Sequence, residues 1–335
     1  MVMDNKSRRS TPIAIVGMAS HFPDSRTLFD FWNNIQNKKD SITDNLGWDG
    51  YWKKEDFYDP DTSNKDKTYA YKGGWIPPID FDPVEFKLPP NMLDSISTAQ
   101  LFSLYVAKQA LRDAGIIGDE NNLVDREKVG VILGGAGNGN TSFSLAARQQ
   151  APYLKEIMTN AGLPEYVVND VIQRLLDQYL EWNEDSFPGF LGNVACGRIS
   201  SYFDLGGTSN MVDAACASSL AAVKAAVGEL AEGSCDAVLT GGVNLENSIF
   251  SFLCFSRTPA LSPSNTSRPF DQKSDGMMLG DGVGFLVLKR LDDAIRHNDR
   301  VYAVLKSISG SSDGCAKSIF APRFEGAGSG FKQSL

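Results

Sequence analysis

Short apolar segments bounded by glycine recur along this chain and alternate with stretches of helical periodicity. Short runs rich in Val, Ile, Leu and Ala are typical of buried strands. Strands that alternate with helices favour an α/β fold, in which helices pack on the faces of a sheet. The predicted strands cover residues 13–17, 129–133, 210–214, 237–240, 284–288 and 301–308.

The segments between these strands supply the predicted helices. Apolar residues recur there at helical spacing, and glycine or proline marks several of the expected ends. Residues 40–92 differ, because they are rich in Pro, Gly, Trp, Tyr and Asp and show little periodicity, so we expect an irregular excursion over the surface. The predicted helices cover 24–37, 97–114, 144–182 (with a break at Leu163–Pro164) and 216–232.

The composition excludes several classes of protein. Hydrophobic residues make up 42% of the 335 residues and charged residues 22%, which excludes disorder as the main state. The net charge of −9 and the lack of a basic run argue against nucleic-acid binding, which needs clustered cations. No apolar stretch reaches the roughly 18 residues of a membrane span. Residues 1–10 form a polar tail without the apolar core of a secretory signal, so we expect a cytoplasmic protein.

The cysteines argue against both a disulfide framework and a metal site. Their number, five, is odd, their spacing is wide, and no CxxC pair occurs, so we expect reduced thiols and no bound metal. Four of them are expected to be small buried hydrophobic residues. These are Cys196, Cys235, Cys254 and Cys315.

The fifth, Cys216, is the candidate catalytic residue. It follows the predicted strand 210–214 directly and begins an alanine-rich helix, with small residues on both sides. The free N–H groups and the positive dipole end at a helix N-terminus favour thiolate over thiol. A backbone N–H beside the sulfur can also stabilise an oxyanion. This pattern leaves two interpretations open, a nucleophile on a tight elbow or a buried structural cysteine.

The residues around Cys216 resemble the active-site segment of β-ketoacyl synthases, the ketosynthase domains of polyketide and fatty-acid synthases. The family segment DTACSSSL corresponds to DAACASSL at 213–220. Other motifs of the family follow in the same order, over about residues 11–325. They are the opening strand and loop at 13–23, GN…GRIS…LG at 192–206, FSR…ALSP at 255–263, RPFD at 268–271, DG…GDG at 275–282 and DG…AP at 313–322.

This resemblance implies the thiolase-like α/β fold, in which two similar halves pack together, usually within a homodimer. It implies that Cys216 accepts an acyl chain from the phosphopantetheine of an acyl carrier protein, with its own N–H as one oxyanion donor. A decarboxylative Claisen condensation then follows, assisted by two histidines. The chain itself is expected to bind no cofactor. The aromatic segment 45–80 and the long helical stretch 144–182 favour the polyunsaturated fatty-acid type of synthase.

Three features depart from the family pattern. The HGTGT motif that carries the first catalytic histidine is missing, and we expect His21 and His297 to be surface or loop histidines without a catalytic role. We therefore expect residues 11–325 to contain the nucleophile-bearing half, with the C-terminal half largely missing and further synthase domains following. Residues 326–335 diverge from the family. Finally, Asp281 stands where the family has Glu.

Two rival functions stay open. One is a non-catalytic scaffold or remnant that keeps the fold without turnover. The other is an acyltransferase that moves acyl groups without decarboxylation, since a thiolate can be acylated without a histidine but condensation needs an acid or base. We also expect half of a thiolase fold to expose an apolar surface.

Overall fold

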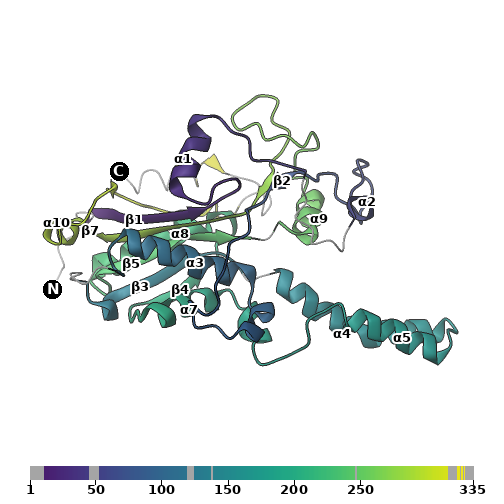
Figure 1. Ribbon diagram of the computed structural model, residues 1–335. Helices are drawn as coiled ribbons and strands as arrows, with labels where there is room; N and C mark the ends of the chain where they lie inside the picture. Colours follow the sequence, from purple (N-terminus) through teal and green to yellow (C-terminus); the bar gives the residue numbers. More distant parts are fainter. Residues whose placement is uncertain are drawn as a thin grey trace.

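The computed structural model (Figure 1) describes residues 11–44, 53–118, 124–136, 139–245, 247–315, 323, 324, 326 and 328. Its strands are β1 (Ile13–His21), β2 (Gly73–Gly74), β3 (Val129–Gly134), β4 (Ser209–Val212), β5 (Ala237–Asn244), β6 (Leu279–Gly280), β7 (Gly282–Arg290) and β8 (Ala303–Leu305). Its longer helices are α1 (Leu28–Gln36), α3 (Thr98–Asp113), α4 (Gly139–Asn160), α5 (Glu165–Leu176), α7 (Asn193–Phe203), α8 (Ser218–Glu232) and α9 (Ile249–Arg257). Its short helices are α2 (Lys54–Phe57), α6 (Ser186–Phe190), α10 (Leu291–Arg296) and the 3₁₀ turns η1 (Pro90–Ser95), η2 (Arg126–Lys128) and η3 (Ala215–Ala217).

Six of these strands form one mixed sheet in the order β4-β3-β5-β7-β1-β8. Strand β3 pairs in parallel with both β4 and β5, whereas the pairs β5–β7, β7–β1 and β1–β8 are antiparallel. Because β3, β4 and β5 are parallel, their carboxyl ends meet at one edge of the sheet, which is where α/β proteins commonly bind their ligands. Strands β2 and β6 form a separate parallel pair near this edge.

Helices cover both faces of the sheet. On one face, α3 packs on β1, β5 and β7, while α7 packs on β3 and β4. Leu104, Leu111 and Ile199 of these helices are fully buried there. On the other face, α8 packs on β3 and β5 through Ala222 and Ala226. Because the alanine side chains are small, the backbone of α8 can lie close to the backbones of β3 and β5.

The predicted alternation of strands and helices is confirmed, with differences at the ends of elements. All six predicted strands are present, but β1 continues to His21 and β8 is shorter than predicted. Helix α1 begins at Leu28 and not at Asp24, because Thr27 and Asp30 form a capping box that ends the preceding turn. The predicted break at Leu163–Pro164 is confirmed, and Gly162, with φ +83°, precedes it.

Two helical regions carry apolar side chains on the surface. Helix α1 has no buried residue, and Phe29 is 72% exposed. On α8, Leu220 is 70% exposed on the side away from the sheet. These are single side chains on separate helices, so the expectation of an apolar face shaped for a second half of the fold stays a prediction. Helices α4 and α5 pack against each other and project away from the sheet (Figure 1).

Several predictions concern residues for which the structure gives no description. The polar tail 1–10, most of the divergent segment 326–335 and the Ala321–Pro322 motif lie outside the described residues. Within the described part of the chain, no helix has both the length and the apolarity needed to cross a membrane.

The expectation that His21 is a surface or loop histidine is wrong. His21 is the last residue of β1 and is 1% exposed. Its ring meets the rings of Phe102 and Tyr105 edge-on, and Nε2–H donates to the carbonyl oxygen of Pro77 at 2.9 Å. Burial lowers the pKa of His21, the bond to Pro77 opposes this in part, and Arg26 lowers the pKa further. His21 is thus held neutral and connects β1 to the segment after β2.

We expect the buried neutral His21 to make the fold sensitive to acid. The unfolded chain takes up a proton at this residue near pH 6.5, whereas the folded chain does so only at lower pH. The free energy of unfolding should therefore be at its full value above about pH 6.5 and decline as the pH falls further. Urea titrations at pH 7.5 and pH 5.5 measure this loss. His21→Gln keeps a donor for Pro77 but does not titrate, so an unchanged loss in this variant would contradict the assignment.

Candidate active site

Cys216 lies in the turn that joins β4 to α8. Strand β4 ends at Val212, the 3₁₀ turn η3 follows, and α8 begins at Ser218. The predicted helix 216–232 is thus correct from residue 218, while Cys216 itself lies in the turn before it. The side chain of Cys216 is exposed, so the alternative of a buried structural cysteine is wrong.

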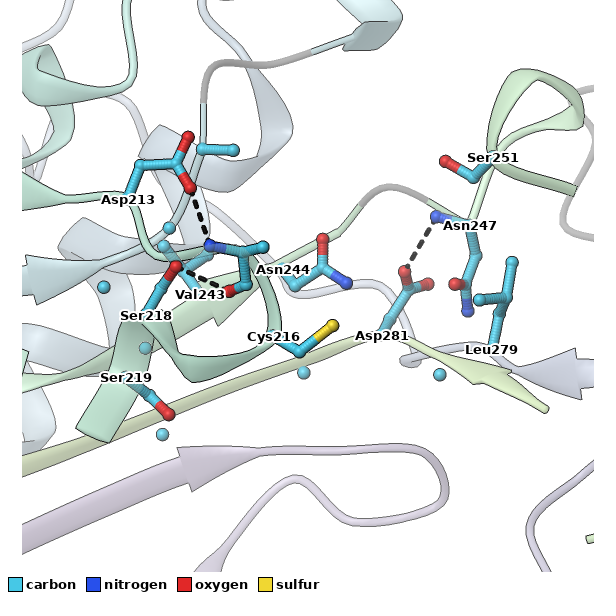
Figure 2. Close-up of a pocket in the computed structure, with 18 of the residues that line it drawn as sticks. Asp213, Cys216, Ser218, Ser219, Val243, Asn244, Asn247, Ser251, Leu279 and Asp281 are labelled. Atoms are coloured by element: carbon cyan, nitrogen blue, oxygen red, sulfur yellow. Dashed lines mark hydrogen bonds between the residues drawn. The ribbon is translucent and has the colours of Figure 1, made fainter. Parts of the chain in front are cut away.

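Three hydrogen bonds hold this turn in shape. Oδ1 of Asp213 accepts from the N–H of Ala215 at 3.0 Å. Oγ of Ser218 accepts from the N–H of Ala214 at 2.9 Å. It also donates to the carbonyl oxygen of Ala215 at 2.6 Å (Figure 2). Ala215 has φ +49°, a region that costs an L-residue energy. The side chains of Asp213 and Ser218 therefore fix a strained backbone directly before the thiol, which is typical of functional sites.

Glycines in the strands beneath allow the turn to lie directly on the sheet. Gly134, the last residue of β3, pairs with Gly242 of β5. A Cβ atom on Gly134 would lie 2.4 Å from the backbone carbonyl of Ser218, and one on Gly242 would lie 2.7 Å from Cβ of Ser219. No real Cβ contact is that short, so both positions require glycine if α8 is to begin where it does.

The thiol opens into a cavity of about 730 Å³ at the carboxyl edge of the parallel strands. In Figure 2 the sulfur of Cys216 points into this cavity, toward the side on which Asn244 and Asp281 lie. The described lining combines apolar side chains with a smaller polar group. The apolar ones are Phe22, Ala136, Ala215, Val243, Phe250, Phe255 and Leu279, and the polar ones besides Cys216 are Asp213, Ser218, Ser219, Asn244, Asn247, Ser251 and Asp281.

Asp281 belongs to a hydrogen-bonded group that joins three segments at the cavity wall. Its carboxylate accepts from the N–H groups of Asn247, at 3.3 Å, and of Ile76. Its own N–H and Nδ2 of Asn247 both donate to the carbonyl oxygen of Gly74, each at 2.8 Å. Burial raises the pKa of Asp281 to about 6, although the two N–H groups that it accepts from partly oppose this.

Neither histidine lies among the described residues that line this cavity. His21 is buried between β1 and α3, as described above. His297 ends α10 and shares a hydrogen bond with Nζ of Lys289 at 2.9 Å. Within the described residues, no group of three or more His, Cys, Asp or Glu side chains is placed to hold a metal ion.

The other cysteines differ in part from expectation. Cys196 and Cys235 are buried, as predicted. Sγ of Cys196 donates to the carbonyl oxygen of Asn210 at 3.0 Å, and burial raises the pKa of this thiol to about 11, which makes it inert. Cys254 and Cys315 are exposed, so their prediction as buried residues is wrong. Burial by itself therefore does not distinguish Cys216 from these two, whereas its place in the cavity does.

Sequence reasoning missed the polar residues that face the thiol across the cavity. Asn244 and Asn247 follow the glycine pair in β5, and Asp281 lies between two glycines. Polar residues directly after a buried strand, at the carboxyl edge of a parallel sheet, were the signal that could have identified the asparagines. Asp281 directly precedes β7, which runs antiparallel to β5. It therefore reaches this edge from the start of a strand and not from its end, and no local sequence pattern connects it to Cys216.

Comparison with known proteins identifies the family. Residues 10–294 match the model of the β-ketoacyl synthase N-terminal domain. The chain is 37% identical over 330 residues to one subunit of the polyunsaturated fatty acid synthase of a Thraustochytrium species, covering 96% of this chain and 11% of that protein. It is 30% identical over 319 residues to the pikromycin polyketide synthase component PikAIII of Streptomyces venezuelae, covering 95% of this chain and 18% of that protein.

Solved structures agree with this match. The oxazolomycin ketosynthase domain OzmH KS7 of Streptomyces albus JA3453 superposes with a TM-score of 0.77 at 25% identity, over 96% of this chain and 50% of that one. The ketosynthase from module 6 of the bacillaene synthase of Bacillus subtilis 168 gives a TM-score of 0.71, also at 25% identity, over 96% of this chain and 49% of that one. The chain thus spans about half the length of these ketosynthases and has their thiolase-like α/β fold. It belongs to the β-ketoacyl synthase family.

Proposed function

We propose that this chain is the nucleophile-bearing part of a condensing enzyme, in which Cys216 accepts an acyl group from the phosphopantetheine of an acyl carrier protein. The observation that carries this proposal is the exposed thiol of Cys216 at the N-terminal end of α8, opening into a cavity of about 730 Å³. The β-ketoacyl synthase match and the similarity to polyunsaturated fatty acid and polyketide synthases support it.

The first chemical step is acyl transfer. The thiolate of Cys216 attacks the carbonyl carbon of the incoming thioester, and the electron pair of the C=O bond moves to oxygen. When the tetrahedral intermediate collapses, the bond to the pantetheine sulfur breaks and the pantetheine leaves as a thiolate. It takes up a proton from solvent, which balances the proton that Cys216 lost on forming its own thiolate. The N–H of Cys216 is the proposed donor to the oxyanion, because it lies in the 3₁₀ turn that leads directly into α8.

The second step is decarboxylative condensation. Loss of carbon dioxide from a malonyl thioester leaves a carbanion that attacks the acyl-cysteine and forms a carbon–carbon bond. This step needs an acid or base to stabilise the developing enolate, and the described lining of the cavity contains no histidine. We therefore propose that the described cavity carries out acylation, and that the histidine-assisted condensation step draws on groups outside its described lining.

The partners and setting follow from the same proposal. We propose an acyl carrier protein as donor, a homodimer as the working assembly, further synthase domains beyond this region, and no cofactor bound by the chain itself. The five cysteines, all free, support a reducing compartment such as the cytoplasm.

The test is transfer from hexanoyl pantetheine thioester, followed by mass spectrometry of the Cys216 peptide. We expect a hexanoyl adduct on Cys216 and none on the buried Cys196 or Cys235. With malonyl pantetheine added, we expect no condensation product from the isolated chain. Formation of a β-ketoacyl product without a histidine in the cavity would contradict the assignment of the second step.

The same assay distinguishes the rivals. A scaffold without turnover gives no adduct on Cys216, or one no faster than on exposed Cys254. An acyltransferase passes the hexanoyl group on to a free thiol without release of carbon dioxide. The lack of a histidine among the described lining residues is the observation that favours this second function for the chain by itself.

A further inference from the structure

The cavity around Cys216 has an unusual balance of charge. Its described lining includes two carboxyl groups, Asp213 and Asp281, and no lysine, arginine or histidine. The titratable groups that face Asp281 across this space are Cys216 and Asp213. Asn244 and Ser251, from β5 and α9, add neutral polar groups. The wall opposite the thiol therefore bears negative charge that no described cation of the lining balances.

The two carboxyl groups have different surroundings. Asp213 is exposed and accepts from the N–H of Ala215, so it is part of the turn that holds the thiol. Asp281 is partly buried, and the hydrogen bonds to its carboxylate come from the backbone N–H groups of Asn247 and Ile76. Backbone donors orient a carboxylate but carry no net charge, so its field extends into the cavity.

A buried carboxylate without a cation reduces stability, because burial disfavours the charged form. The raised pKa of Asp281, about 6, reflects this cost. An asparagine at this position would provide a polar side chain without the charge. Costly groups of this kind concentrate where proteins use them for function.

We propose that Asp281 is a specificity-determining residue whose carboxylate disfavours negatively charged acyl donors at Cys216 and so selects uncharged acyl groups for loading. This proposal rests on the acylation of Cys216 set out above. It assigns to Asp281 an electrostatic role across the cavity, separate from the hydrogen bonds that the residue makes with Asn247, Ile76 and Gly74.

The test compares two alkylating reagents that differ in charge. Iodoacetamide is neutral and iodoacetate is an anion between pH 5 and pH 8, and both attack the same sulfur. The ratio of their rate constants at Cys216, followed by mass spectrometry of its peptide, therefore cancels the fraction of thiolate. We expect the iodoacetate-to-iodoacetamide ratio to fall by about threefold to tenfold from pH 5 to pH 8, the size expected for one added negative charge that faces the reagent in an open, solvent-filled cavity. The midpoint should lie near pH 6, where Asp281 ionises.

Substitutions at Asp281 test whether this residue causes the pH dependence of the ratio. Asp281→Asn removes the charge, and the ratio should then vary little with pH and stay high at pH 8. Asp281→Glu keeps the charge and should retain the pH-dependent ratio, which a role in side-chain packing alone does not predict. Asp170→Asn, on the exposed helix α5, is the matched control and should behave as the unmodified chain.

The same selection should be visible with acyl donors of equal length. Hexanoyl pantetheine should load Cys216 faster than adipoyl pantetheine, which ends in a carboxylate, and Asp281→Asn should reduce this preference. A ratio of alkylation rates that is independent of pH in the unmodified chain overturns the proposal, even if Asp281→Asn does not fold. If Cys216 reacts with both alkylating reagents but accepts no acyl group, the proposed function fails. A rate ratio that does not change with pH, in a chain that does accept acyl groups, overturns only the role of Asp281.

Discussion

Cys216→Ala should abolish acyl loading of the chain, with a loss of at least about 10³-fold in the rate of adduct formation from hexanoyl pantetheine. The sulfur is the atom that forms the new bond, so no neighbouring group can replace it. The side chain is exposed, so its removal should change the free energy of unfolding by less than about 0.5 kcal/mol. Intact-protein mass spectrometry and a urea titration measure the two effects.

Cys254→Ala is the matched control for this variant. Cys254 is also exposed, but it lies on α9 and does not line the cavity. We expect its removal to leave acyl loading unchanged. Comparable loss of loading in both variants would show that exposure alone governs reactivity and would contradict the role of the elbow.

Gly134→Ala should have the largest effect on stability among these substitutions. The added Cβ would lie 2.4 Å from the backbone of Ser218, so either β3 or the start of α8 must move. Overpacking of this kind against backbone costs about 1–3 kcal/mol, and sometimes more. Because Cys216 directly precedes α8, the same shift should displace the thiol and slow its acylation by at least about tenfold. Urea titration and the hexanoyl loading assay measure both losses.

Gly228→Ala, within α8, is the opposite case and serves as control. A Cβ at Gly228 meets nothing within 4 Å, and alanine is the better helix former. We expect this variant to be more stable by about 0.5–1 kcal/mol and to load acyl groups at the normal rate. Equal behaviour of the two glycine variants would mean that the proximity of β3 and α8 does not hold Cys216 in place.

The position of Cys216 could be predicted because the signal is local. A strand, a cysteine between small residues and an alanine-rich helix follow one another directly along the chain, so neighbours in sequence are neighbours in space. The glycines Gly134 and Gly242 were visible as the ends of predicted strands. The structural role of these two glycines could not be predicted, because it depends on the pairing of β3 and β5 beneath the start of α8.

The residues that escaped prediction depend on contacts between distant segments. His21 is polar and ends a strand, which favours exposure, yet Phe102 and Tyr105 of α3 enclose it. Asp281 reaches the cavity because β7 runs antiparallel to β5 and begins where β5 ends. Cys196 is buried because it lies on α7, which packs on β3 and β4, whereas Cys254 lies on α9, whose buried residues are Phe252 and Ser256. Which side of each helix is covered depends on segments far away in the sequence.

The arrangement of the sheet has a consequence for biosynthesis. Ile13, at the start of β1, pairs with Arg290 of β7 and with Leu305 of β8. At 5–20 residues per second, a ribosome needs roughly 15–60 s after β1 to make the two strands that pair with it. During that interval the apolar residues of β1 have no partner in the sheet, so the nascent polypeptide presents a hydrophobic segment to which holdase chaperones can bind until translation delivers β7.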